Sequence, residues 1–279
     1  MTRRVAVALM LLSLMPAPAW GFSSSTVAEA LQNVLVRGRT ADPHHDHGYR
    51  HKEITALAIA DLGLSEPARQ LMGWHNFLTD WDQYEHTPWR PPNSRYQPAD
   101  HFDRNEHETS AESFRRGLVA LEHRRKTASG LLRRGRAEAG LAVLGRALHA
   151  VQDLHAHSNM VDLGEPDRRV IRALLVGQAH EVPPPLLAKL RLTGTSRRVM
   201  GDLAPSDDRE PGYGHEAFSK DNADKNAEAK APAPGAPGRT KYQLAFDLAT
   251  EATRAFLLSV RDDAGAAGWT EALTYRPGP

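Results

Sequence analysis

Apolar residues recur at the 3.6-residue spacing of an α-helix along most of the chain, whereas the two-residue alternation typical of a β-strand is scarce. This spacing predicts helices over residues 26–37, 51–62, 110–126, 131–157, 165–176, 184–192 and 241–262, and a shorter one that begins at Ser65 as its N-cap. Prolines and aromatic residues between positions 80 and 104 predict a long ordered loop. We therefore expect an all-α fold, a single-domain helical bundle with long loops.

The first 19 residues have the pattern of a signal peptide. Arg3 and Arg4 precede a short apolar run, and Ala17-Pro18-Ala19 is a cleavage site of the Ala-x-Ala type. Cleavage there would leave Trp20 as the first residue of an exported domain that covers residues 20–279. No other stretch approaches the roughly 18 apolar residues of a membrane span, so we expect no stable membrane anchor.

Composition narrows the chemistry of any site. The chain has 35 Lys and Arg against 34 Asp and Glu, so no overall basic charge points to nucleic acid. It has no cysteine, and a metal ion would need nitrogen and oxygen ligands. Twelve of its 14 histidines lie between His44 and His157. Residues 222–239, rich in alanine and proline, are of low complexity and predict a mobile loop within the domain.

The stretch ALHAVQDLHAHSN, residues 147–159, carries the strongest chemical pattern. His149, Asp153 and His157 follow one another at four-residue steps and share one helix face. The two histidines are about 12 Å apart along the axis, so one ion cannot easily bind both, and Asp153 could bridge two ions. A single histidine on an apolar face is usually a core residue. Two histidines and an aspartate in register on one face favour a metal site instead. His155 falls on another face, as a surface residue or as support for the ligands.

Neighbouring residues of the same stretch supply groups that can orient the ligands. The side chains of Gln152, Ser158 and Asn159 can hydrogen-bond to the imidazole nitrogens that do not bind metal.

The longer run LGRALHAVQDLHAHSN resembles the motif of the zinc-dependent phospholipase C superfamily, which includes single-strand nucleases, and most of all its Het-C-like branch. The resemblance implies a helical bundle that holds up to three zinc ions. It also implies ligands scattered along the whole mature chain. The matching positions are Trp20, His51, Asp80, His101, His149, Asp153, His157, His215 and Asp221.

Several of these matches leave alternatives open. Asp82 is a rival to Asp80, which the resemblance makes the candidate for activating water. Ser219 stands where the phospholipases have a glutamate after the histidine that His215 matches, so either Asp221 or Glu216 would supply that carboxylate. The step from Asp153 to the next histidine is also shorter than in the phospholipases, which places the substrate in doubt more than the metal.

Together with the signal peptide, the resemblance implies an exported zinc-dependent phosphodiester hydrolase, with a phospholipid favoured over a nucleic acid as substrate. The aromatic residues of the 81–102 loop could contact a lipid, stack on bases or pack inside the loop. Two alternatives belong to the same superfamily. One is a single-strand nuclease or nucleotidase, and the other is a zinc-stabilised interaction protein of the Het-C type without catalysis.

Overall fold

The structure, a computed structural model, describes residues 51–81, 97–105, 107–194, 210, 213–221, 223 and 226–277. Within these ranges every regular element is a helix, and the only β-type pairings are isolated bridges. The all-α prediction is confirmed. None of the described helices is long and apolar enough to cross a membrane.

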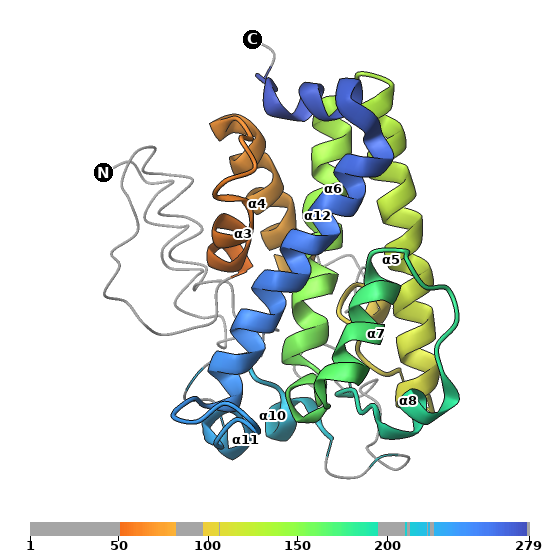
Figure 1. The fold of residues 1–279 in the computed structure, drawn as a ribbon, viewed down its shortest axis with the longest axis vertical. Helices are drawn as coiled ribbons and strands as arrows, with labels where there is room; N and C mark the ends of the chain where they lie inside the picture. Colours follow the sequence, from red (N-terminus) through yellow and green to blue (C-terminus); the bar gives the residue numbers. More distant parts are fainter. Residues whose placement is uncertain are drawn as a thin grey trace, which may run out of the picture.

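A central helix organises the bundle (Figure 1). Helix α6 (Ala137–Ala156) packs against α4 (Glu66–Trp81), α5 (Ser110–Arg133) and α12 (Lys241–Leu273). Every residue from 147 to 158 is buried, so the second half of α6 is enclosed on all sides. The remaining elements surround this core. They are α3 (His51–Ile59), η2 (Pro98–Asp100), η3 (Met160–Asp162), α7 (Glu165–Leu175), α8 (Pro184–Lys189), α10 (His215–Phe218) and α11 (Ala227–Lys230).

Helices α5 and α6 show how local sequence sets the ends of an element. Thr109 and Glu112 form a capping box, and α5 therefore begins at Ser110 as predicted. The predicted break between residues 126 and 131 is wrong, because α5 continues to Arg133. The turn lies at Gly135, whose φ of 69° is in the left-handed region that favours glycine.

Two other helices end at residues that differ from the prediction. Helix α4 extends to Trp81, so Asp80 lies in a helix and not at the start of a loop. Helix α12 continues past residue 262 to Leu273, through a kink at Gly265. The predicted helix over residues 26–37 lies outside the described residues.

Part of the segment predicted to be mobile has defined structure. Asn226 caps α11 by accepting a hydrogen bond from the backbone N–H of Ala229. Ala233 donates to the carbonyl of Arg239 at 2.8 Å, which closes a turn before α12. Residues 226–240 therefore form a short helix and a turn at the end of the bundle where α12 begins (Figure 1).

The side chain of His155 is buried in the bundle, so of the two positions predicted for it, on the surface or in support of the ligands, the surface one is wrong. Its Nδ1 lies 2.9 Å from the carbonyl oxygen of Val151. Burial lowers the pKa of His155 from 6.5 to about 4. The sequence pattern suggested an exposed face because it assumed an amphipathic helix, whereas this part of α6 is surrounded.

Acid should destabilise the protein through His155. The unfolded chain takes up a proton near pH 6.5, while the folded chain takes it up only near pH 4. Between these values the unfolded state binds more protons. The free energy of unfolding therefore decreases as the pH is lowered from 6.5 to 4, by up to about 3 kcal/mol. Urea unfolding of the parent and of His155→Gln across this range measures the effect. The difference between the two profiles isolates His155, and parallel profiles would contradict the assignment.

Candidate metal centre

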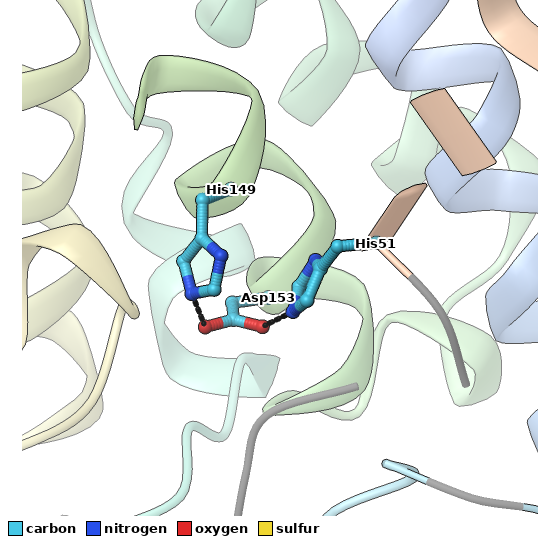
Figure 2. Close-up of side chains that lie close together, drawn as sticks. All are labelled: His51, His149 and Asp153. Atoms are coloured by element: carbon cyan, nitrogen blue, oxygen red, sulfur yellow. Dashed lines mark ion pairs between the residues drawn. The ribbon is translucent and has the colours of Figure 1, made fainter. Parts of the chain in front are cut away.

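Asp153 lies at the centre of a buried group that also contains His51, His101 and His149, which we call the first group. Nε2 of His149 lies 2.9 Å from Oδ2 of Asp153, and Nδ1 of His101 lies 2.8 Å from the same oxygen. Nε2 of His51 approaches the other oxygen, Oδ1, at 3.4 Å. Figure 2 shows His51 and His149 on either side of the carboxylate, each with one ring nitrogen directed at it.

Three separate elements bring these side chains together. His149 and Asp153 are one turn apart on α6, so they share a face as predicted. His51 is the first residue of α3, and His101 follows the short helix η2. The resemblance implied that all four are metal ligands, and the structure brings the three histidines within contact distance of Asp153.

Asp153 is charged and incompletely satisfied. Burial by itself would raise the pKa of this carboxyl, but the positive charge on His149 and His157 and hydrogen bonds from His101 and His149 hold it well below its usual range. Among the described residues Oδ1 has no hydrogen-bond partner. A buried carboxylate oxygen without a partner is costly, and a cation between Asp153 and the imidazoles would satisfy it.

A second group forms around His157, at the C-terminal end of α6. Its Nδ1 lies 2.9 Å from Oδ1 of Asp103, and its Nε2 lies 3.2 Å from Oδ1 of Asp221. Nε2 of His215 is 3.9 Å from Oδ2 of Asp221. Burial opposes charge on His157, but the carboxylates of Asp103 and Asp153 raise its pKa well above the usual value.

Hydroxyl groups orient the carboxylates of the second group. Thr193 donates to Oδ1 of Asp103 at 2.8 Å, and Ser219 donates to Oδ2 of Asp221 at 3.1 Å. The hydroxyl of Ser219 also contacts the carbonyl oxygen of His215 at 2.6 Å, so it links His215 to Asp221, which lies against His157. Of the two carboxylates left open by the sequence, Asp221 is the one within the described side chains.

The two groups are distinct in the described residues. The ligand atoms of His51, His149 and Asp153 lie within 4.8 Å of one another, and so do those of Asp103, His157 and His215. These two sets share no residue, which agrees with the expectation that one ion cannot bind both His149 and His157. The bridging of two ions by Asp153 stays a prediction.

Asp103 belongs to the second group, although neither the helix pattern nor the resemblance predicted it as a ligand. It is 2% exposed, and it sits two residues after His101, in the segment HFD. Phe102 between them has a φ of 55°, in the left-handed region, and its ring is buried beside Phe114. Phe102 therefore packs in the core and does not contribute to a substrate surface. A signal existed in the sequence, because HFD places two ligand-type residues on either side of an apolar anchor.

The remaining predicted site residues separate into two classes. Trp20 and Asp82 lie outside the described residues, as do the side chains of Asp80 and Glu216. Gln152 contacts a ligand of the first group, with Oε1 2.7 Å from Nδ1 of His51.

Ser158 and Asn159 have structural roles in the contacts described. Ser158 bonds to the carbonyl of Leu154, and Asn159 donates to the carbonyl of Lys189 and accepts from the N–H of Arg191. The aromatic residues Tyr84, Trp89 and Tyr96 of the predicted loop lie outside the described residues.

No protein-family model, no curated protein and no solved structure matches this chain. The two buried His and Asp groups, each of which could hold a metal ion, are therefore the features of this chain that indicate a function.

Gly117→Ala should disturb both groups at once. A Cβ at Gly117, on α5, would lie 2.4 Å from Cε1 of Phe102, and the ring would have to move. Since Phe102 joins His101 to Asp103, we expect a loss of about 1–3 kcal/mol of stability and a lower metal content. Chemical unfolding and metal analysis measure both. Gly73→Ala on α4 is the matched control, because its Cβ would meet nothing within 4 Å. Equal stability and equal metal content of the two variants would contradict the proposed role of Phe102.

Proposed function

We propose that the protein is an exported zinc-dependent phosphodiester hydrolase of the phospholipase C type. The observation that carries this proposal is Asp153, a fully buried carboxylate with imidazole nitrogens of three histidines around it and one oxygen without a hydrogen-bond partner in the described part of the chain. Nitrogen and carboxylate ligands in such a cluster suit zinc in a chain without cysteine.

The chain would divide its ligands between two sites. The first group offers three imidazoles and one carboxylate, and the second offers two imidazoles and two carboxylates. When bound, zinc supplies positive charge that stabilises phosphoryl oxygens and activates water. A third ion would require Trp20, as the resemblance to the superfamily implies. Two neighbouring groups on one helix favour a reaction at a phosphodiester, for which paired ions are common.

Asp80 remains the proposed group that orients or deprotonates the attacking water. Asn76 of α4 contacts His149 of the first group, and Asp80 follows Asn76 by four residues on the same helix. Asp80 is therefore one helical turn beyond the residue of α4 that contacts the first group. We favour Asp80 over Asp82 for this reason.

The test combines metal analysis with a panel of substrates. We expect at least two zinc ions per purified mature chain. We also expect zinc-dependent hydrolysis of a phosphatidylcholine or of a simple phosphodiester. Activity on single-stranded DNA without activity on phospholipid would replace this proposal with the nuclease alternative. Absence of bound zinc would overturn both.

A zinc-stabilised protein without catalysis is the second candidate, and the burial of the ligands favours it. None of the eight side chains in the two groups is more than 5% exposed. A catalytic zinc site keeps a position open for water or substrate, whereas a structural site is closed. Stoichiometric zinc with no hydrolysis of any substrate in the panel would select this candidate.

We also propose that the mature chain begins at Trp20, which lies outside the described residues. Cleavage after Ala19 exposes the amine that the superfamily uses as a zinc ligand. Intact mass and N-terminal sequencing of the exported protein measure the cleavage site. A mature chain that begins after Trp20 would exclude this residue as a ligand and would leave the two described groups as the zinc sites.

A further inference from the structure

Two buried amide side chains, Asn76 and Gln152, contact the histidines of the first group at the ring nitrogens that face away from the carboxylate. Oδ1 of Asn76 lies 3.1 Å from Nδ1 of His149. Oε1 of Gln152 lies 2.7 Å from Nδ1 of His51. Both amides are fully buried, so water does not compete for these contacts.

The hydrogen bonds around the two amides fix which end of each is oxygen. Nδ2 of Asn76 donates to Oε1 of Gln152 at 3.1 Å and to Oγ1 of Thr55 at 3.2 Å. Nε2 of Gln152 donates to Oγ1 of Thr55 at 2.9 Å and to Oγ1 of Thr253 at 3.4 Å. All four amide protons thus have an acceptor.

The reversed orientation satisfies the same atoms less well. With both amides turned, Asn76 would have one acceptor for its two protons among the contacts described, the Nδ1 of His149. The single hydroxyl proton of Thr55 would then face the oxygens of both amides. Because buried polar groups are nearly always paired, the first orientation is the stable one.

This orientation determines the tautomer of both histidines. An amide oxygen only accepts, so Nδ1 of His51 and of His149 must each carry a proton. When the imidazole is neutral, the lone pair is then on Nε2, the atom that approaches Asp153 in both residues. When His149 is charged, the same Nε2 carries the second proton and donates it to Asp153, and this is the proton that a metal ion displaces. Two imidazole lone pairs directed at a carboxylate form a set of electron-rich donors, and such a set binds a cation.

We propose that Asn76 and Gln152 are positioning residues that hold His51 and His149 as Nδ1–H tautomers before any metal ion binds. The inference rests on the metal centre of the proposed function and not on hydrolysis. Metal-binding histidines are usually oriented by a carboxylate, a backbone carbonyl or water. Neutral amides do the same here without adding charge, so Asp153 is the single anion of the first group and a bound dication keeps a net positive charge for an anionic substrate.

Nuclear magnetic resonance of the metal-free chain tests the tautomers directly. Long-range correlation of ring protons with ¹⁵N-labelled histidine nitrogens distinguishes Nδ1–H from Nε2–H. At mildly alkaline pH and below the melting transition, we expect His51 and His149 as Nδ1–H tautomers, beside His155, whose Nδ1 faces the carbonyl oxygen of Val151. If His51 and His149 both carry the proton on Nε2 instead, the proposal is wrong. The readout requires neither zinc nor activity, so a chain that hydrolyses nothing would still decide it.

Two substitutions of Asn76 separate positioning from packing. Asn76→Leu keeps the branched shape of the side chain but removes the acceptor, and it should weaken zinc binding by about 10–100-fold. Asn76→Asp keeps an oxygen for His149 and should retain its Nδ1–H tautomer. Its second oxygen would face Oε1 of Gln152, so that amide should turn and convert His51 alone to Nε2–H.

Selective conversion of one tautomer is an outcome that loss of packing cannot produce. Zinc affinity equal to the parent in Asn76→Leu, or unchanged tautomers of both histidines in Asn76→Asp, would overturn the proposal. If Asn76→Leu does not fold, the spectrum of the metal-free parent still settles which nitrogen is protonated.

Discussion

Asp153→Asn should remove at least one zinc ion per chain and lower any phosphodiesterase activity by orders of magnitude. Asp153 is the carboxylate that contacts three histidines of the first group, and it is fully buried. The substitution replaces an anionic donor by a neutral amide, whose NH₂ is directed at imidazole nitrogens or at the ion itself. Elemental analysis of the purified variant, beside hydrolysis rates, measures both effects.

The matched control is Asp263→Asn, which makes the same chemical change away from the site. Asp263 is in α12 and pairs with Arg125 of α5, and it contacts neither His and Asp group in the described structure. It should keep the zinc content of the parent. His155→Ala, the control that the helix pattern suggests, is unsuitable because that ring is buried. Full zinc in Asp153→Asn, or an equal loss in the control, would show that the helix face is assigned incorrectly.

The sequence predicted the part of the site that lies along one helix. His149 and Asp153 are four residues apart, and helical periodicity alone places them on one face. His157 follows in the same register, and the resemblance named His51, His101, His215 and Asp221, but no pattern named Asp103. Asp103 is positioned by the left-handed backbone of Phe102 and by the space that Gly117 leaves for its ring, and neither feature has a local sequence pattern.

The fold was predictable in its class and less so in its boundaries. Apolar spacing identified the main described helices, since burial of one face is what most of them require. The break between α5 and α6 was misplaced because Gly130 resembles a helix end as much as Gly135 does. Tertiary packing decides between them, as Gly130 is buried within α5. His155 was misassigned for a related reason, since periodicity describes a helix with one buried face and α6 is buried on every side near its end.

Removal of zinc should lower the melting temperature of the protein strongly and reversibly. The ligands converge from α3, α6, α10 and the η2 segment, and they are dispersed in the unfolded chain. Zinc present at a thousand times its dissociation constant stabilises each site by about 4 kcal/mol. At about 2–4 °C per kcal/mol for a chain of this size, each emptied site should lower the melting temperature by roughly 10 °C.

Calorimetry after chelation, with metal loss confirmed by elemental analysis, measures this shift, and added zinc should restore the original transition. Asp153→Asn provides an internal comparison, because a variant that has already lost one ion has less stability left to lose. Its response to chelator should therefore be smaller than that of the parent, while Asp263→Asn should respond like the parent. An unchanged transition in the metal-free parent would mean that the two groups are stable without an ion. The hydrogen bonds from His101, Thr193 and Ser219 and the protonated His157 would then have to balance the three buried carboxylates without a metal ion.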